Sequence, residues 1–98
     1  MHRHTKIIAT LGPSVADEGG VRSLIEAGMD VARLNFSHGD YELHESFARW
    51  VREAAKDLGR SVALLQDIQG PKLRVGEFEQ GSVILEKGAE VRLSPSGE

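Results

Sequence analysis

The sequence predicts an α/β fold with a parallel sheet, and three observations support this prediction. Short apolar runs typical of buried strands alternate with segments whose apolar residues recur at helical spacing. The connections between them are short, which favours right-handed crossovers between parallel strands. The strand-like runs start near positions 6, 30 and 61, so each strand-plus-helix unit takes roughly 25 to 31 residues, and eight such units would make a barrel of about 250 residues. A chain of 98 residues therefore predicts part of a (β/α)8 barrel.

The first strand is expected at residues 6–11, where an apolar run stops at Gly12 and Pro13. The helix that follows is expected to begin after the N-cap Asp17 and to end at Gly28. Its apolar residues recur at helical spacing: Val21, Leu24 and Ile25.

The second strand is expected at residues 30–35 and the third at residues 62–65. Between them, an amphipathic helix is expected to start after the N-cap Asp40 and to stop at Gly59. One face of this helix is apolar: Leu43, Phe47, Trp50, Val51, Ala54 and Leu58.

The pattern changes after residue 70, because no helix follows the third strand. Short β-like pieces at residues 73–75, 83–85 and 91–93 are separated by glycines, which is typical of an antiparallel meander. We therefore expect two units, the N-terminal part of the barrel at residues 1–70 and the beginning of an inserted, incomplete β-rich domain at residues 71–98.

Composition excludes several functional classes. The net charge of −3 argues against a nucleic-acid or anionic-membrane surface, and the absence of cysteine excludes disulfides and thiolate chemistry. The longest apolar run is residues 62–65, too short for a membrane span of about 20 residues. The polar N-terminus lacks the apolar core of a secretory signal. These features favour a soluble, cytoplasmic protein.

Polar residues cluster where the three predicted strands end, at residues 10–14, 33–39 and 66–74. Ligands of parallel α/β sheets bind at this edge. Taken one at a time, several of these residues are typical of turns, caps and solvated positions: Asn35, Ser37, His38, Asp40, Asp67, Lys72 and Arg74. The remaining histidines are expected to be ordinary as well, His44 on the solvent side of its helix and His2 and His4 at the terminus, and Trp50 is expected in the core.

Taken together, the polar residues favour a site. Arg33 lies in an otherwise apolar strand, where its charge would be costly unless it meets an anion at the strand end. Oxygen donors on two neighbouring strand ends, beside basic side chains, are typical of sites that handle phosphate. The residues therefore predict a phosphate-binding edge.

Three segments carry a resemblance to a known family. Residues 5–14 (TKIIATLGPS) resemble the opening strand and turn of pyruvate kinases, and residues 25–39 (IEAGMDVARLNFSHG) resemble their second-strand signature. Residues 67–74 (DIQGPKLR) are similar to the stretch where the family's barrel passes into its inserted β-domain. The resemblance implies a glycolytic enzyme that transfers the phosphoryl group of phosphoenolpyruvate to ADP.

The resemblance also implies roles for individual residues. Arg33 would contact the substrate phosphate. The nucleotide phosphates would meet Asn35, Phe36, Ser37, His38 and Arg74. The family's monovalent-cation site would comprise Asn35, Ser37, Asp67 and Ile68. No catalytic residue falls in this segment, because the family's catalytic lysine and its Mg²⁺ ligands lie on later strands.

Position 72 distinguishes two classes within the family. Members with glutamate there resemble the potassium-dependent class, and members with lysine resemble the potassium-independent class. Lys72 implies that K⁺ is not required, because an ammonium group near Asp67 could replace the charge of the cation.

Two alternatives stay open. The chain could be a truncated, non-catalytic module that binds phosphate, a nucleotide or another protein. It could also come from a different barrel enzyme that uses phosphoenolpyruvate, although the combined motifs disfavour this. For the leading interpretation we expect ADP and ATP as further ligands, no nucleic acid or membrane partner, and a homotetrameric full-length enzyme whose N-terminal piece is inactive alone.

Overall fold

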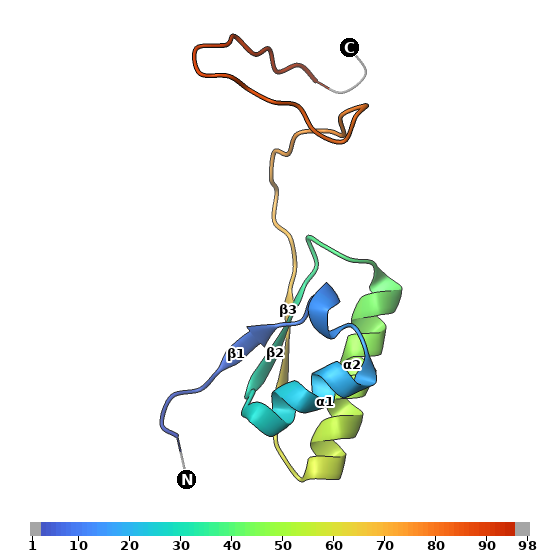
Figure 1. Ribbon diagram of the computed structural model, residues 1–98. Coiled ribbons are helices and arrows are strands. Elements are labelled where there is room, and N and C mark those ends of the chain that lie inside the picture. The colour runs from blue at the N-terminus through green and yellow to red at the C-terminus, as the bar shows by residue number, and fades with distance from the viewer. Residues whose placement is uncertain (1–2, 96–98) are drawn as a thin grey trace.

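The computed structural model describes residues 3–95, so His2 and the last three positions of the expected second unit lie outside the described residues. Three parallel strands, β1 (Ile8–Thr10), β2 (Val31–Asn35) and β3 (Ala63–Asp67), form a sheet in the order β1-β2-β3 (Figure 1). A short 3-10 helix, η1 (Pro13–Val15), follows β1. The predicted alternation of strands and helices is confirmed, and the strand bounds shift by one to two residues at most ends.

Helix α1 (Glu18–Ala27) connects β1 to β2, and α2 (Tyr41–Leu58) connects β2 to β3. Both N-caps are the predicted aspartates, whose carboxylates accept backbone N–H groups three residues later. Both helices end on a glycine in the left-handed conformation, Gly28 (φ 119°) and Gly59 (φ 64°). The caps that the sequence predicts are therefore those that the structure uses.

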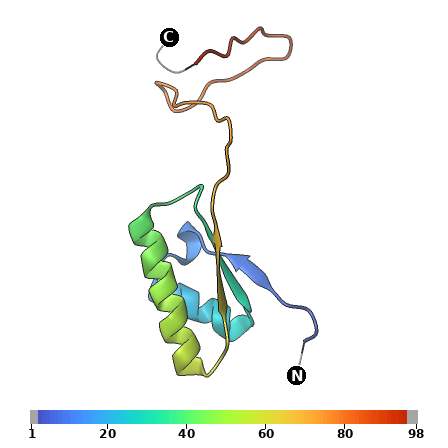
Figure 2. The same cartoon turned by 180° about the vertical axis from the view of Figure 1, so that it is seen from behind.

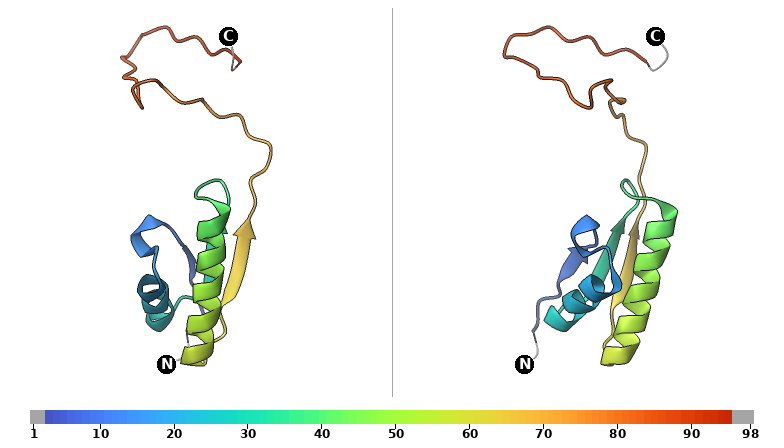
Figure 3. Two further views of the ribbon diagram at one scale, coloured as in Figure 1. Left: turned by 90° about the vertical axis from the view of Figure 1, so that its right-hand side faces the viewer. Right: turned by 45° about the vertical axis from the view of Figure 1, so that its right-hand side comes forward.

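The two helices cover one face of the sheet (Figure 3). Along β2, Ala32 and Leu34 point toward the helices and are buried, whereas Val31, Arg33 and Asn35 alternate with them and are only half-buried. The core is continuous from strand to helix: Leu11, Val21, Ile25, Met29, Ala32, Leu34, Phe47, Val51 and Ala54. Trp50 packs against this core, as predicted.

The opposite face of the sheet is open. Ile8 of β1 is 58% exposed and Leu65 of β3 is 39% exposed, although both are apolar. In a closed (β/α)8 barrel this face lines the interior. The architecture is therefore that of a partial barrel.

Residues 68–95 leave the sheet and extend away from it (Figures 1 and 2). The molecule measures 55 × 29 × 24 Å with a radius of gyration of 18.7 Å, against about 13 Å for a compact chain of this length. Turns form at Gly81 (φ 80°) and Gly88 (φ 88°), as the glycine spacing predicts.

The short strands expected at residues 73–75, 83–85 and 91–93 do not form within the part of the chain that the structure describes. Their apolar side chains are exposed, Leu73 and Ile84 most of all. A strand needs a hydrogen-bonded neighbour, and an isolated hairpin is marginal in water. No helix in residues 3–95 is both long and apolar enough to cross a membrane.

Candidate functional site

The candidate site lies at the carboxyl ends of the three strands. The register pairs Thr10 of β1 with Arg33 of β2, and Asn35 of β2 with Asp67 of β3. Since residues paired across parallel strands lie side by side, polar groups far apart in the sequence meet at one edge. The structure thus brings Arg33, Asn35 and Asp67 together, as the sequence predicts.

Arg33 connects all three strands. Its Nε donates to Oδ2 of Asp67 at 2.9 Å, and one terminal nitrogen donates to the same oxygen. The other terminal nitrogen donates to Oγ1 of Thr10 at 2.9 Å. The Arg33 side chain is 30% exposed, and that of Asp67 is 44% exposed. The charge of Arg33 is therefore paired, and its guanidinium is still accessible from solvent.

The loop after β2 has a defined conformation. Oδ1 of Asn35 accepts the backbone N–H of Ser37 at 3.0 Å, and the carbonyl of Asn35 accepts the N–H of His38 at 3.1 Å. The backbone N–H of Phe36 donates to the carbonyl of Asp67 at 3.0 Å. These bonds tie the loop to the end of β3, beside the Arg33–Asp67 pair.

The prediction that His44 faces solvent is wrong. His44 is 6% exposed, and its Nε2 lies 2.7 Å from the carbonyl oxygen of His38. Its ring stacks on Phe36, with centroids 4.4 Å apart and an interplanar angle of 10°. The helical spacing does indicate burial at this position. His44 precedes Phe47 by three residues and Val51 by seven, so it falls on the apolar face of the helix.

Comparison with known proteins now decides the family. The family model for the pyruvate kinase barrel domain matches residues 2–98. The chain belongs to the pyruvate kinase family.

Individual pyruvate kinases agree with this assignment. The chain is 54% identical over 94 residues to the pyruvate kinase of Corynebacterium glutamicum. This match covers 96% of this chain and 20% of the Corynebacterium protein. It is 47% identical over 96 residues to the pyruvate kinase of Geobacillus stearothermophilus. That match covers 98% of this chain and 16% of the Geobacillus protein. The crystal structure of Cryptosporidium parvum pyruvate kinase superposes with a TM-score of 0.72 at 47% identity, over 82% of this chain and 17% of that one. The chain thus spans about a fifth of the length of these relatives.

The pyruvate kinase match confirms the family that residues 5–14, 25–39 and 67–74 indicate. It also runs through residues 71–98, which the barrel-domain model includes. The division into two units at position 70 therefore stays a prediction.

Three further residues to which the pyruvate kinase resemblance gives a role do not join the group around Arg33. Ile68, Lys72 and Arg74 are exposed on the segment that leaves the sheet. Within residues 3–95, Asp67 forms its ion pair with Arg33, and Lys72 forms none. The role of Lys72 as a replacement for K⁺ stays a prediction.

Among the described residues, no group of three or more His, Cys, Asp or Glu side chains is arranged to hold a metal ion. The oxygens of Asn35 and Asp67 that the resemblance assigns to a monovalent cation already accept hydrogen bonds from Ser37 and Arg33. This donor set does not fit Mg²⁺, which needs several oxygen ligands in octahedral geometry.

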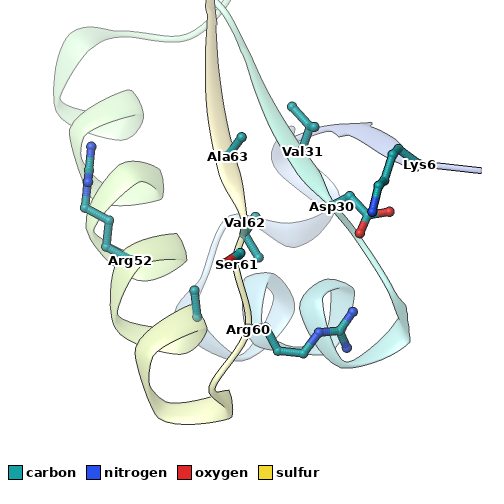
Figure 4. A pocket seen from close by; sticks show the side chains of 9 residues that line it. Lys6, Asp30, Val31, Arg52, Arg60, Ser61, Val62 and Ala63 are labelled. Atoms are coloured by element: carbon teal, nitrogen blue, oxygen red, sulfur yellow. The ribbon is translucent and has the colours of Figure 1, made fainter. Parts of the chain in front are cut away.

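An open groove lies at the opposite edge of the sheet, where the strands begin (Figure 4). Lys6, Asp30, Arg52 and Arg60 are among its lining residues. The Asp30 carboxylate accepts the backbone N–H of Ile7 at 2.9 Å. The pKa of Asp30 lies below its usual 3.8, chiefly because of this hydrogen bond. Burial raises the pKa, whereas the positive charges of Arg3 and Lys6 lower it. Asp30 thereby fastens the start of β1 to the start of β2.

Proposed function

We propose that this chain supplies the phosphate-binding edge of an enzyme that transfers the phosphoryl group of phosphoenolpyruvate to ADP, giving pyruvate and ATP. The observation that carries the proposal is the Arg33 guanidinium, held at the carboxyl ends of the strands and open to solvent. A guanidinium has five N–H donors. Arg33 uses three of them on Asp67 and Thr10, which leaves one N–H on each terminal nitrogen for a phosphate.

The nucleotide would bind beside Arg33. Asn35 ends β2, and Phe36, Ser37 and His38 begin the loop that follows it. Ser37 is half-buried and His38 is exposed. Arg74 would reach the nucleotide phosphates from the extended segment after β3. The backbone N–H groups of Phe36, Ser37 and His38 already donate within the protein. The donors that this loop would offer to phosphate oxygens are therefore side-chain groups, such as the hydroxyl of Ser37.

Of the two cation sites, the one for Mg²⁺ would lie outside this chain and the one for a monovalent cation would lie within it. Mg²⁺ would bind to residues that this chain does not contain, because the donors in residues 3–95 do not fit it. We propose that K⁺ is not required and that Lys72 replaces its charge in the assembled site. By the same family relationship we propose a cytoplasmic homotetramer with no nucleic-acid or membrane partner.

A chimera tests the proposal. In it, residues 2–98 of this chain replace the matching segment of the Corynebacterium glutamicum pyruvate kinase, so that the remaining barrel is supplied. We expect the chimera to form pyruvate from phosphoenolpyruvate and ADP in a coupled lactate dehydrogenase assay, and the 98-residue chain alone to form none.

A chimera that folds and assembles but forms no pyruvate would overturn the proposal in favour of a non-catalytic phosphate-binding module. Turnover by the 98-residue chain alone would show that the missing elements are not needed.

A further inference from the structure

His44 combines two properties that packing alone does not explain. It lies on the apolar face of α2, 6% exposed, between the sheet and the loop that follows β2. Its Nδ1 is buried without any hydrogen-bond partner in the part of the chain that the structure describes. A buried nitrogen without a partner is costly, and a leucine or phenylalanine would fill the same space without that cost.

The other ring nitrogen explains why a histidine stands here. A carbonyl oxygen can only accept, so Nε2 carries the proton and donates to the carbonyl of His38 at 2.7 Å. In the neutral form of the imidazole, this assignment leaves Nδ1 as the nitrogen without a proton. The ring therefore holds the loop backbone through one directed bond from α2.

The loop is shaped around the ring on two further sides. Phe36 stacks on it at 4.4 Å. Gly39 has φ 74°, and a Cβ at that position would lie 3.4 Å from Cε1 and Nε2 of His44. The imidazole thus contacts Phe36 and His38, and the absence of a side chain at Gly39 leaves room beside it.

We propose that His44 is a positioning residue that fixes the conformation of the loop at residues 35–39 and thereby the placement of the nucleotide. This inference rests on the proposed function, because it assigns the loop to the nucleotide side. His44 itself touches neither substrate; it acts through the carbonyl of His38 and the ring of Phe36.

Three variants of the chimera separate the two contacts. His44→Phe keeps a flat ring against Phe36 and removes the donor. His44→Gln keeps an N–H near the position of Nε2 and removes the ring. Phe47→Leu is the control for destabilisation, because Phe47 is equally buried one turn along α2 and makes no hydrogen bond to the loop.

We expect His44→Phe to raise the KM for ADP about fivefold, the effect of losing one neutral hydrogen bond. The KM for phosphoenolpyruvate should change less than twofold. His44→Gln should restore most of the KM for ADP, and Phe47→Leu should lower the melting temperature with both KM values unchanged.

The proposal is overturned if His44→Phe leaves the KM for ADP unchanged, or if it raises both KM values equally. It is also overturned if His44→Gln is no better than His44→Phe. An inactive parent chimera would instead contradict the proposed function, and hydrogen exchange at the amides of Ser37 and His38 would then decide the positioning role. Unchanged exchange in His44→Phe would overturn it, and faster exchange would support it.

Discussion

Arg33 and Asp67 form an ion pair between the central strand and its neighbour, with Nε of Arg33 2.9 Å from Oδ2 of Asp67. The two residues are 34 positions apart, and they meet because β2 and β3 are parallel and in register at this edge. The pair holds the guanidinium in one orientation while part of it stays exposed. An anion that bound at this edge would therefore meet an arginine whose side chain is already ordered.

Replacing Arg33 by lysine tests the need for the planar fork. Lysine keeps the charge but lacks the planar fork that directs separate N–H groups at Asp67, Thr10 and a phosphate. We expect Arg33→Lys to lower kcat/KM for phosphoenolpyruvate in the chimera by about 10- to 100-fold, the loss of one or two charge-assisted hydrogen bonds. Arg49→Lys on the exposed face of α2 is the matched control and should have no effect. A change of less than twofold in Arg33→Lys would contradict the assignment.

Lys72 is tested by reversing its charge. The parent chimera should have the same rate with KCl as with a sodium salt of equal ionic strength. Lys72→Glu should be slower without K⁺ and should recover several-fold when K⁺ is added, because a carboxylate beside Asp67 needs a cation. Lys87→Glu, at an exposed turn, makes the same charge change away from the strand edge. A several-fold activation of the parent by K⁺ would refute the prediction.

Gly39 and Gly59 provide a matched pair, because both have a positive φ. An alanine at either position should reduce the free energy of unfolding by about 1 kcal/mol through backbone strain. A Cβ at Gly39 would also lie 3.4 Å from Cε1 and Nε2 of His44, in van der Waals contact with the ring, whereas a Cβ at Gly59 would meet nothing within 4 Å. We expect Gly39→Ala alone to raise the KM for ADP. Equal kinetics in the two variants would show that the loop tolerates the displacement.

Asp30 gives a prediction with a definite sign. Because its pKa is lowered in the folded state from 3.8, its carboxylate stabilises the fold above that pH. This stabilisation is lost as the pH falls through the lowered value. The difference in melting temperature between the parent and Asp30→Asn should therefore be largest near neutral pH and should shrink as the pH falls below 3.8. Glu53→Gln, at an exposed position of α2, is the control. A difference in melting temperature between the parent and Asp30→Asn that grows on acidification would contradict the prediction.

Much of the α/β part could be predicted, because its signals are local. The N-caps Asp17 and Asp40 and the terminal glycines of both helices act within one turn of the chain. The alternation of apolar residues along β2 fixes which face is covered. The grouping of Arg33, Asn35 and Asp67 follows from the parallel topology alone.

Other features depend on contacts that no local pattern contains. The partner of Arg33 could be a ligand or a carboxylate from another strand. The register between β2 and β3 places Asp67 beside Asn35, two residues beyond Arg33, and the side chain of Arg33 reaches it from there. The polar side chain of His44 favours a prediction of solvent exposure, although its helical spacing places it on the buried face of α2, where it lies. The apolar pieces at residues 83–85 and 91–93 have strand composition, but pairing also requires a neighbouring strand.

The most direct test of the account is a crystal structure of the chimera with phosphoenolpyruvate bound. We predict a phosphate oxygen within hydrogen-bond distance of a terminal nitrogen of Arg33, with the bond from Arg33 Nε to Asp67 retained. A phosphate bound elsewhere, with Arg33 contacting only Asp67 and Thr10, would contradict the claim that this edge of the sheet binds the substrate.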